Sequence, residues 1–407
     1  MVERRIVPEA DIRVEVAHGI SPKLDAPAPR LWSGACFMGA AWFKAANAID
    51  ARTVLAMRPD GSTVAAIPSA GLGPSLMGIR AVPGSYWPFR SIAVAADAQP
   101  AELQALLSAP RARRALSPVW RVGPVLREDL AVAMLEQAAV RSGWTVLVRT
   151  LGKTFVLSLR DQIDSGGWPR KSTRRRLENY ERQLAKKGEL HVRFVTGSAW
   201  NEGVFEALAA IEANSWVGRR SDGRGAQFLA AGQCALWRRA VSDPQIAEAL
   251  SATILTVGGE PAAFSFDLRA GERQYSIASS YDERFAAARP GKIVTYRQLQ
   301  WAAGQGVQTV DLGVGDSGYK QEMGARPGSQ MIDLLIVRSS PLGWLLSFKW
   351  GPKSELARTD LPTSMDARRH RNRIVAQVAT AAAVAAAAFA VSRCCTPMAP
   401  PDPDNVI

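Results

Sequence analysis

Residues 260–320 decide the fold of this chain: EPAAFSFDLRAGERQYSIASSYDERFAAARPGKIVTYRQLQWAAGQGVQTVDLGVGDSGYK. Alternating apolar runs separated by a Gly-containing turn predict two paired strands at 262–268 and 274–281. An amphipathic helix is predicted over 292–305, and a further strand follows it at 309–314. A meander that leads into such a helix is typical of a protein that binds a phosphorylated ligand beside an open sheet.

The start of the predicted helix offers an anion site, because the first N–H groups of a helix have no partner within it. We expect a pyrophosphate on the amides of Gly291, Lys292 and Ile293, directly after Pro290. Gly291 would let the backbone come close to the ligand, and Lys292 would add positive charge. The alternative is that Pro290 and Gly291 only begin the helix.

Length and composition bound the fold and the function classes. A chain of 407 residues, 47% of them hydrophobic, predicts two domains with real cores. Fifty basic against 37 acidic residues give a net charge of +13, which favours anionic partners without choosing among them. Four cysteines without CxxC spacing and three isolated histidines predict no disulfide framework and no metal site. The first residues lack an apolar signal segment, so we expect a cytoplasmic protein.

Both halves of the chain show the same order of predicted elements: helix, hairpin, helix, strand. This order indicates a duplicated α/β unit, although no residue-level repeat is visible. The predicted divisions are an N-terminal half at 1–160, a C-terminal half at 161–340 and a tail at 341–407.

Five separated motifs follow one another in the chain: Thr173–Leu177, Glu212–Trp216, Ser279–Phe285, Pro290–Lys292 and Asp311–Lys320. Together they resemble the CelD-like branch of the GNAT acyltransferases, which is associated with cellulose and exopolysaccharide biosynthesis. The resemblance implies tandem GNAT-like domains related to FemAB-type transferases, each a mixed, mostly antiparallel sheet flanked by helices. It also implies acetyl-CoA or another acyl-CoA as co-substrate. The usual phosphate loop, a Gln or Arg followed by Gly-x-Gly, is missing, and Arg289–Lys292 stands in its place.

The resemblance also implies where the chemistry lies. In GNAT enzymes two neighbouring strands splay and the pantetheine runs between them, which places the splay between the strands at 274–281 and 309–314. Asp282 and Asp316 follow these strands, where a general base would act. The alternative is that both aspartates cap turns, as loop aspartates commonly do.

Two tyrosines and two further residues complete the implied site. Tyr281 and Tyr319 could protonate the departing thiolate. Trp216 and Lys320 would contact the acceptor, although Trp216 could instead be a core residue of an amphipathic helix.

The helix expected over 172–187 is strongly basic. Its only acids are Glu178 and Glu181. The basic residues in and beside it are Arg170, Lys171, Arg174, Arg175, Arg176, Arg182, Lys186 and Lys187. Such a helix could bind an acidic polymer, a lipid headgroup or tRNA. The alternative is a solvated face on a helix whose other side packs.

The pattern changes after residue 337. An apolar, aromatic segment at 341–350 precedes a basic cluster at 368–373 and an Ala-rich apolar run at 374–391. That run is near the lower length limit for a membrane span, so weak association with the inner face of the membrane is one interpretation. A soluble helix is the other. Cys394 and Cys395 could be lipidated only if they stayed cytoplasmic.

Three functions stay open at this point. The first is an acyl-CoA-dependent N- or O-acyltransferase that acts on a cell-envelope or exopolysaccharide precursor. It would take a small-molecule or glycan-precursor acceptor and no nucleic acid. The second is a FemAB-like transferase that uses aminoacyl-tRNA, and the third is a non-catalytic polysaccharide-assembly factor.

Overall fold

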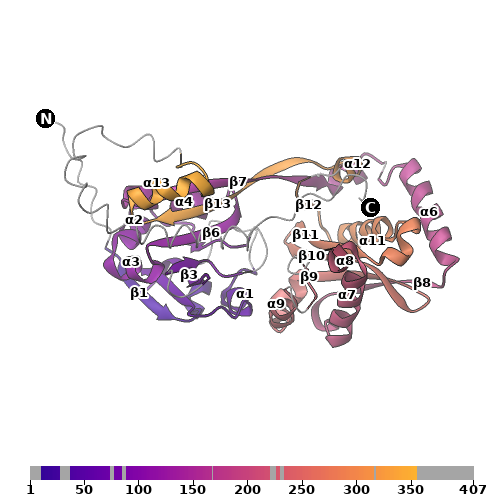
Figure 1. Ribbon diagram of the computed structural model, residues 1–407, viewed down its shortest axis with the longest axis horizontal. Helices are drawn as coiled ribbons and strands as arrows, with labels where there is room; N and C mark the ends of the chain where they lie inside the picture. The colour runs from indigo at the N-terminus through magenta and orange to yellow at the C-terminus, as the bar shows by residue number, and fades with distance from the viewer. Residues whose placement is uncertain are drawn as a thin grey trace. The chain divides into compact units, whose positions relative to one another are not determined.

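The computed structural model describes residues 11–27, 37–73, 78–84, 89–166, 168–220, 226–229, 233–315 and 318–354. These residues form two compact units. Of the described residues, the first unit includes 38–152 and 330–354, and the second includes Lys153–Ser329. The chain passes from the first unit to the second within strand β7 (Thr145–Ser158) and returns within strand β13 (Arg326–Val337) (Figure 1).

The predicted divisions at 160 and 340 therefore differ from the compact units. The predicted C-terminal half at 161–340 includes strand β13, but Met331–Val337 pairs with strand β6 (Val119–Leu126) of the first unit. Helix α13 (Ser340–Trp350), which the sequence placed in the tail, continues that unit, because Leu346 and Trp350 join its core cluster. Local sequence carries no sign of this return, since the pairing partners are far apart in the chain.

The first unit has a mixed sheet with helices packed on it. Besides β6, β7, β13 and α13 it contains β1 (Arg13–His18), β2 (Arg52–Met57), β3 (Thr63–Gly71), β4 (Ile79–Ala81), β5 (Ala93–Val94), α1 (Ala40–Ala45), α2 (Pro100–Ser108), α3 (Pro110–Leu116) and α4 (Leu130–Arg141). The strand order is β1-β2-β3-β4-β6-β13-β7, with β5 beside β3. The hairpin predicted over 53–68 is confirmed by the antiparallel pairing of β2 with β3.

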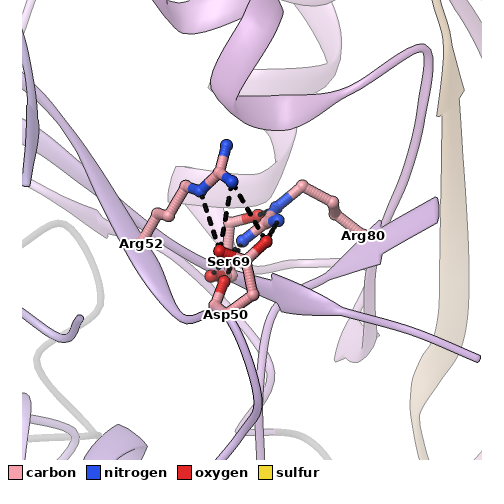
Figure 2. A network of polar contacts seen from close by, with 4 residues as sticks. All are labelled: Asp50, Arg52, Ser69 and Arg80. Carbon is pink, nitrogen blue, oxygen red and sulfur yellow. Dashed lines mark hydrogen bonds and ion pairs between the residues drawn. The ribbon is translucent and has the colours of Figure 1, made fainter. Parts of the chain in front are cut away.

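Strand β4 is anchored by a buried arginine (Figure 2). The side chain of Arg80 is 5% exposed and lies 2.6 Å from the carboxylate of Asp50. Its Nε donates to the hydroxyl of Ser69, 2.8 Å away. Arg52 approaches the same carboxylate at 3.1 Å from a more exposed position. The bond from Arg80 is the main reason that the pKa of Asp50 is lowered.

The second unit has its own sheet and a larger set of helices. It contains β8 (Leu190–Val195), β9 (Leu250–Val257), β10 (Glu260–Ala270), β11 (Arg273–Tyr281), β12 (Thr309–Val314), α5 (Leu159–Asp164), α6 (Lys171–Ala185), α7 (Glu202–Asn214), α8 (Trp216–Arg220), α9 (Cys234–Ala240), α10 (Pro244–Ala249), α11 (Pro290–Gly304) and α12 (Tyr319–Glu322). The strand order is β7-β12-β11-β10-β9-β8. The strands and the helix predicted within 260–320 are all confirmed.

Helices cover both faces of this sheet. On one face, Thr253 donates to the side chain of Gln298 on α11. On the other, the ring of Trp237 on α9 lies 4.9 Å from the ring of Phe266, whose strand partner is Ala252. Successive residues of a strand point to opposite faces, so α11 and α9 lie on opposite sides of β9 and β10.

The two units share a structural repeat that the sequence does not reveal. In each, two strands pair in parallel over three residue pairs only: β4 with β6 in the first unit and β11 with β12 in the second. The last paired residue of the second strand is Arg121 in one unit and Asp311 in the other. Two residues later each strand has a glycine with positive φ, Gly123 at 123° and Gly313 at 83°. The duplication is therefore preserved in the strand geometry.

The predicted membrane segment cannot be placed on the fold. Within the described ranges, no helix combines the length and the apolar character that a bilayer crossing needs. The basic cluster at 368–373, the Ala-rich run at 374–391 and the cysteines Cys394 and Cys395 lie outside the described residues. Weak membrane association through them stays a prediction.

Candidate functional site

Strands β11 and β12 pair only where they begin. Their parallel ladder ends at Tyr275 and Asp311. Beyond that point β11 continues its ladder with β10, and β12 is paired with β7. No ladder pair joins 276–281 to 312–314, so the pairing of the two strands suits a third, extended chain between these edges. The splay predicted between these two strands is confirmed.

A bulge bends β11 at the point where its pairing with β12 stops. Ser276 faces Asp267 of β10 and Ala278 faces Phe266, which leaves Ile277 as an extra residue. A bulge of this kind bends the strand and locally increases its twist. The bend explains why β11 stays with β10 while it leaves β12.

A second irregularity lies in β12. Its register with β7 shifts after Asp311, whose carboxylate accepts a hydrogen bond from the amide of Gly313 at 2.9 Å. Gly313 has a positive φ that side-chain-bearing residues avoid. Asp311 is 1% exposed, and burial raises its pKa, although the Gly313 amide opposes that effect.

A cavity of about 50 Å³ is lined by residues of α6, α11 and α12. The side chains that give it its chemistry are Arg176, Tyr180, Lys292, Tyr296, Tyr319 and Glu322. The first turns of α11 and the helix that follows β12 both line it, so the cavity lies near the ends of the splayed strands. Two of the predicted site residues, Lys292 and Tyr319, are brought together here.

The cavity combines positive charge with phenol groups. Lys292 Nζ lies 3.6 Å from a carboxylate oxygen of Glu322, and Arg176 adds a second cation from α6. Burial raises the pKa of Tyr296, whose ring stacks on Trp168 at 6.0 Å. Two cations against one carboxylate suit an anionic group such as a phosphate.

The amide cradle expected at the start of α11 is mostly occupied. The N–H groups of Lys292 and Ile293 both donate to the carbonyl of Arg289, at 3.0 and 3.4 Å. Pro290 has no N–H. Of the three predicted amides, only that of Gly291 is not engaged in these two bonds. A phosphate at this helix start would therefore rely on side chains more than on the backbone.

Of the two predicted bases, Asp282 and Asp316, the structure describes only Asp282. Asp282 is fully buried, and its carboxylate accepts bonds from the backbone amide and the Nε of Arg284, both at 2.9 Å. This is the capping alternative, which leaves the side chain engaged in the loop. Asp316 lies outside the described residues. Tyr281 ends β11 and packs against the buried cluster that includes Phe285.

The predicted acceptor residues are not at the cavity wall. Lys320 is 6% exposed, and its Nζ donates to the carbonyls of Gly313 at 3.1 Å and Gly315 at 2.6 Å. It therefore holds the end of β12. Trp216 is half-buried at the start of α8, on a different element from those that enclose the cavity.

The neighbouring motif residue Glu212 has a clear structural task. Its buried carboxylate accepts hydrogen bonds from the amides of Gln227, Phe228 and Leu229, at 2.8, 2.7 and 3.1 Å. Burial raises the pKa of Glu212, and these three bonds oppose the rise. The side chain holds residues 227–229 against α7.

One buried acid, Asp267, was not among the site residues predicted from the sequence. Asp267 on β10 is 0% exposed and accepts bonds from the hydroxyls of Ser265 at 2.7 Å and Ser276 at 2.8 Å. Burial raises its pKa to about 6, against the opposing effect of these hydroxyls. The available signal was an acid within an apolar strand, flanked by Phe266 and Leu268.

In the part of the chain that the structure describes, no group of three or more His, Cys, Asp and Glu side chains is placed to hold a metal ion.

Known proteins share this fold. Residues 171–321 match a family model described as an acetyltransferase (GNAT) domain. Among solved structures, L-PGS from Bacillus licheniformis is similar at 16% identity over 83% of this chain and 99% of that chain, with a TM-score of 0.51. FemX is similar at 12% identity over 82% and 99% of the two chains, also with a TM-score of 0.51. No curated protein matches the sequence.

The matched segment contains α6, α11, the splayed strands and most of the residues that line the cavity. The strand order of both units and the similarity to the two solved structures indicate the same architecture. The chain has a tandem GNAT-like α/β fold, and the match of residues 171–321 to an acetyltransferase (GNAT) domain indicates a transferase.

Proposed function

We propose that this protein transfers an acyl group from an acyl-CoA to an amine or hydroxyl of a cell-envelope or exopolysaccharide precursor. The observation that carries the proposal is the short ladder between β11 and β12, which ends at Tyr275 and Asp311 and leaves two facing backbone edges. The acceptor class is part of this proposal and rests on the resemblance to the CelD-like branch.

The residues present fit an acyl-CoA in two respects. The amides of a pantetheine arm can hydrogen-bond to the open edges of β11 and β12 as a strand would. The phosphates can pair with Lys292 and Arg176 at the cavity between α6 and α11. The backbone cradle fits less well, since the amides of Lys292 and Ile293 are engaged with Arg289. The bound thioester would supply an activated acyl carbon.

Calorimetric titration of the full chain with acetyl-CoA and a longer acyl-CoA tests this proposal. Lys292→Ala should weaken binding about 10-fold and make it less sensitive to salt, because one phosphate contact is lost. Glu322→Gln is the matched control, since it removes the carboxylate 3.6 Å from Lys292 and should leave binding equal or tighter. A folded chain that binds neither ligand would remove the acyl-CoA donor.

An aminoacyl-tRNA donor is the second candidate, and helix α6 is the observation that favours it. Arg174, Arg175 and Arg182 on this helix and Lys186 directly after it are all exposed, beyond the cavity. Such a face suits a polyanion whose binding falls steeply with salt. Charge reversal at Arg175 and Arg182 should then abolish transfer from charged tRNA, whereas full activity in a nuclease-treated sample argues against it.

A further inference from the structure

A serine and an aspartate lie where the splay begins. Ser276 is the first residue of β11 beyond its ladder with β12, and its side chain is half-buried. Its hydroxyl donates to Oδ1 of Asp267, 2.8 Å away on β10. Asp267 itself is fully buried, so the hydroxyl of Ser276 links this carboxyl to the open edge of β11.

Among the residues that the structure describes, the partners of Asp267 are uncharged. The groups that face it from β9, β10, β11 and α11 are the hydroxyls of Ser251, Ser265 and Ser276 and the amides of Gln274 and Gln298. None of these groups is a cation that could hold the carboxylate ionised.

A carboxyl in such a place is a stronger base than a surface aspartate. Burial raises the pKa of Asp267 to about 6, so the group is ionised at pH 8 and still binds a proton readily. A proton acceptor works best when its pKa lies near the working pH. The structure thus offers a base of suitable strength at the start of the splay, connected to it by one hydroxyl.

Resting on the acyl transfer proposed above, we propose that Ser276 and Asp267 form a relay that removes the proton of the attacking amine. As the amine nitrogen bonds to the acyl carbon, its proton passes to Ser276 Oγ, and the hydroxyl proton of Ser276 passes to Asp267 Oδ1. The bond between the acyl carbon and the donor sulfur breaks, and the leaving thiolate takes a proton from water. Asp267 returns its proton to water through the same hydroxyl.

The chain contains a matched control for this relay. Ser265 donates to the other oxygen of Asp267 at 2.7 Å but is 4% exposed and lies on β10, away from the open edge. Ser265→Ala and Ser276→Ala therefore each remove one hydroxyl bond from the same carboxylate. Only the second change breaks the proposed path of the proton.

The test measures thiol release from acetyl-CoA by the full chain, with glucosamine as the amine probe. Ser276→Ala should lower kcat about 100-fold or more, and Ser276→Thr should restore most of it. Ser265→Ala should stay within about 3-fold of wild type at high pH, with its acid limb moved to higher pH, because losing a hydroxyl raises the pKa of Asp267. That pKa can be followed directly by NMR with ¹³C-labelled aspartate.

The outcomes are separable. Equal losses of kcat in Ser265→Ala and Ser276→Ala would overturn the relay, and so would an Asp267→Asn chain with the rate and pH profile of wild type. A wild-type chain that releases no thiol from any acyl-CoA would overturn the proposed function, and the relay with it. An active wild type with an unaffected Ser276→Ala variant would overturn the relay alone.

Discussion

The carboxylate of Asp311 accepts a hydrogen bond from the backbone amide of Gly313, 2.9 Å away in the same strand. This local bond turns the amide of Gly313 toward its own strand, and the ladder between β12 and β11 ends at Asp311. A side chain two residues upstream therefore helps to keep the strand pair open at the place where the proposed donor would lie.

The first prediction concerns this bond. Asp311→Ala leaves the Gly313 amide without its acceptor and should weaken acyl-CoA binding about 10-fold, because the edge of β12 is free to rearrange. Asp311→Asn keeps an acceptor oxygen and should bind within about 3-fold of wild type. Calorimetry on the folded variants checks both. Unchanged binding in Asp311→Ala would show that the bond does not shape the splay.

The second prediction concerns the anchor of β4 in Figure 2. Asp50→Ala should lower the free energy of unfolding by about 1–3 kcal/mol, because the buried guanidinium of Arg80 loses its carboxylate. Arg52→Ala should change it by less than about 1 kcal/mol, because its pair with Asp50 is largely exposed. Urea unfolding separates the two variants, and equal losses would contradict this assignment.

The same carboxylate has a pH signature with a definite sign. The pKa of Asp50 is lowered on folding, so the stability that it contributes is present above its unfolded pKa, near 4, and is lost as the pH falls through the lower folded value. Asp50→Asn should lack this acid-side loss. The comparison is made by thermal unfolding of both chains between about pH 3 and pH 6.

A third prediction concerns the buried charges of the first unit. The side chain of Asp333 is 0% exposed and lies 2.7 Å from Arg121 and 2.6 Å from Arg149. Asp333→Ala removes the carboxylate that pairs with the buried Arg121 and should destabilise the unit by about 3–5 kcal/mol. The double variant Arg121→Met with Asp333→Leu should recover part of this loss in Tm. If the double variant is less stable than Asp333→Ala, the account in terms of buried charge fails.

A fourth prediction follows from Asp267. Its folded pKa of about 6 lies above the ordinary value, so its stabilising contribution is complete below about pH 4 and is lost as the pH rises through 6. Asp267→Asn should abolish that loss and be more stable than wild type at pH 8 by up to about 3 kcal/mol, since the shift is about two pH units. Denaturant unfolding at pH 4 and pH 8 gives the difference. A variant less stable than wild type at pH 8 would contradict the pKa assignment.

This variant should move stability and activity in opposite directions. If the relay is correct, Asp267→Asn gains stability at pH 8 while it loses thiol release. A purely structural carboxyl would lose both or neither, so the pair of measurements distinguishes the two roles.

Strand alternation explains why the sequence pointed to some of these residues and not to others. Phe264, Phe266 and Leu268 alternate with Ser265 and Asp267, a pattern typical of a strand with one solvated face. Helix α11 packs against that polar face and buries it. Sequence periodicity thus identified β10 correctly but could not show that Asp267 is enclosed.

The predicted site divides in the same way. Lys292 and Tyr319 were identified from the helix start and the motif after β12, and the structure brings them together at one cavity. Asp282 and Lys320 belong to the same motifs but are engaged by Arg284 and by carbonyls of β12. Spacing along the chain cannot tell a side chain that faces a cavity from one that closes a loop.

What the sequence by itself determined is the set of local elements. Turn residues, apolar periodicity and the Pro290 helix start fix the strands and α11 within 260–320, because these signals act between residues close in the chain. Tertiary structure alone decided the rest: the return of β13 to the first unit, the three-pair ladder that opens at Asp311, and the burial of Asp267 under α11. Each of these is stabilised by pairing or packing between residues that are far apart in the chain. A local sequence pattern does not report such contacts.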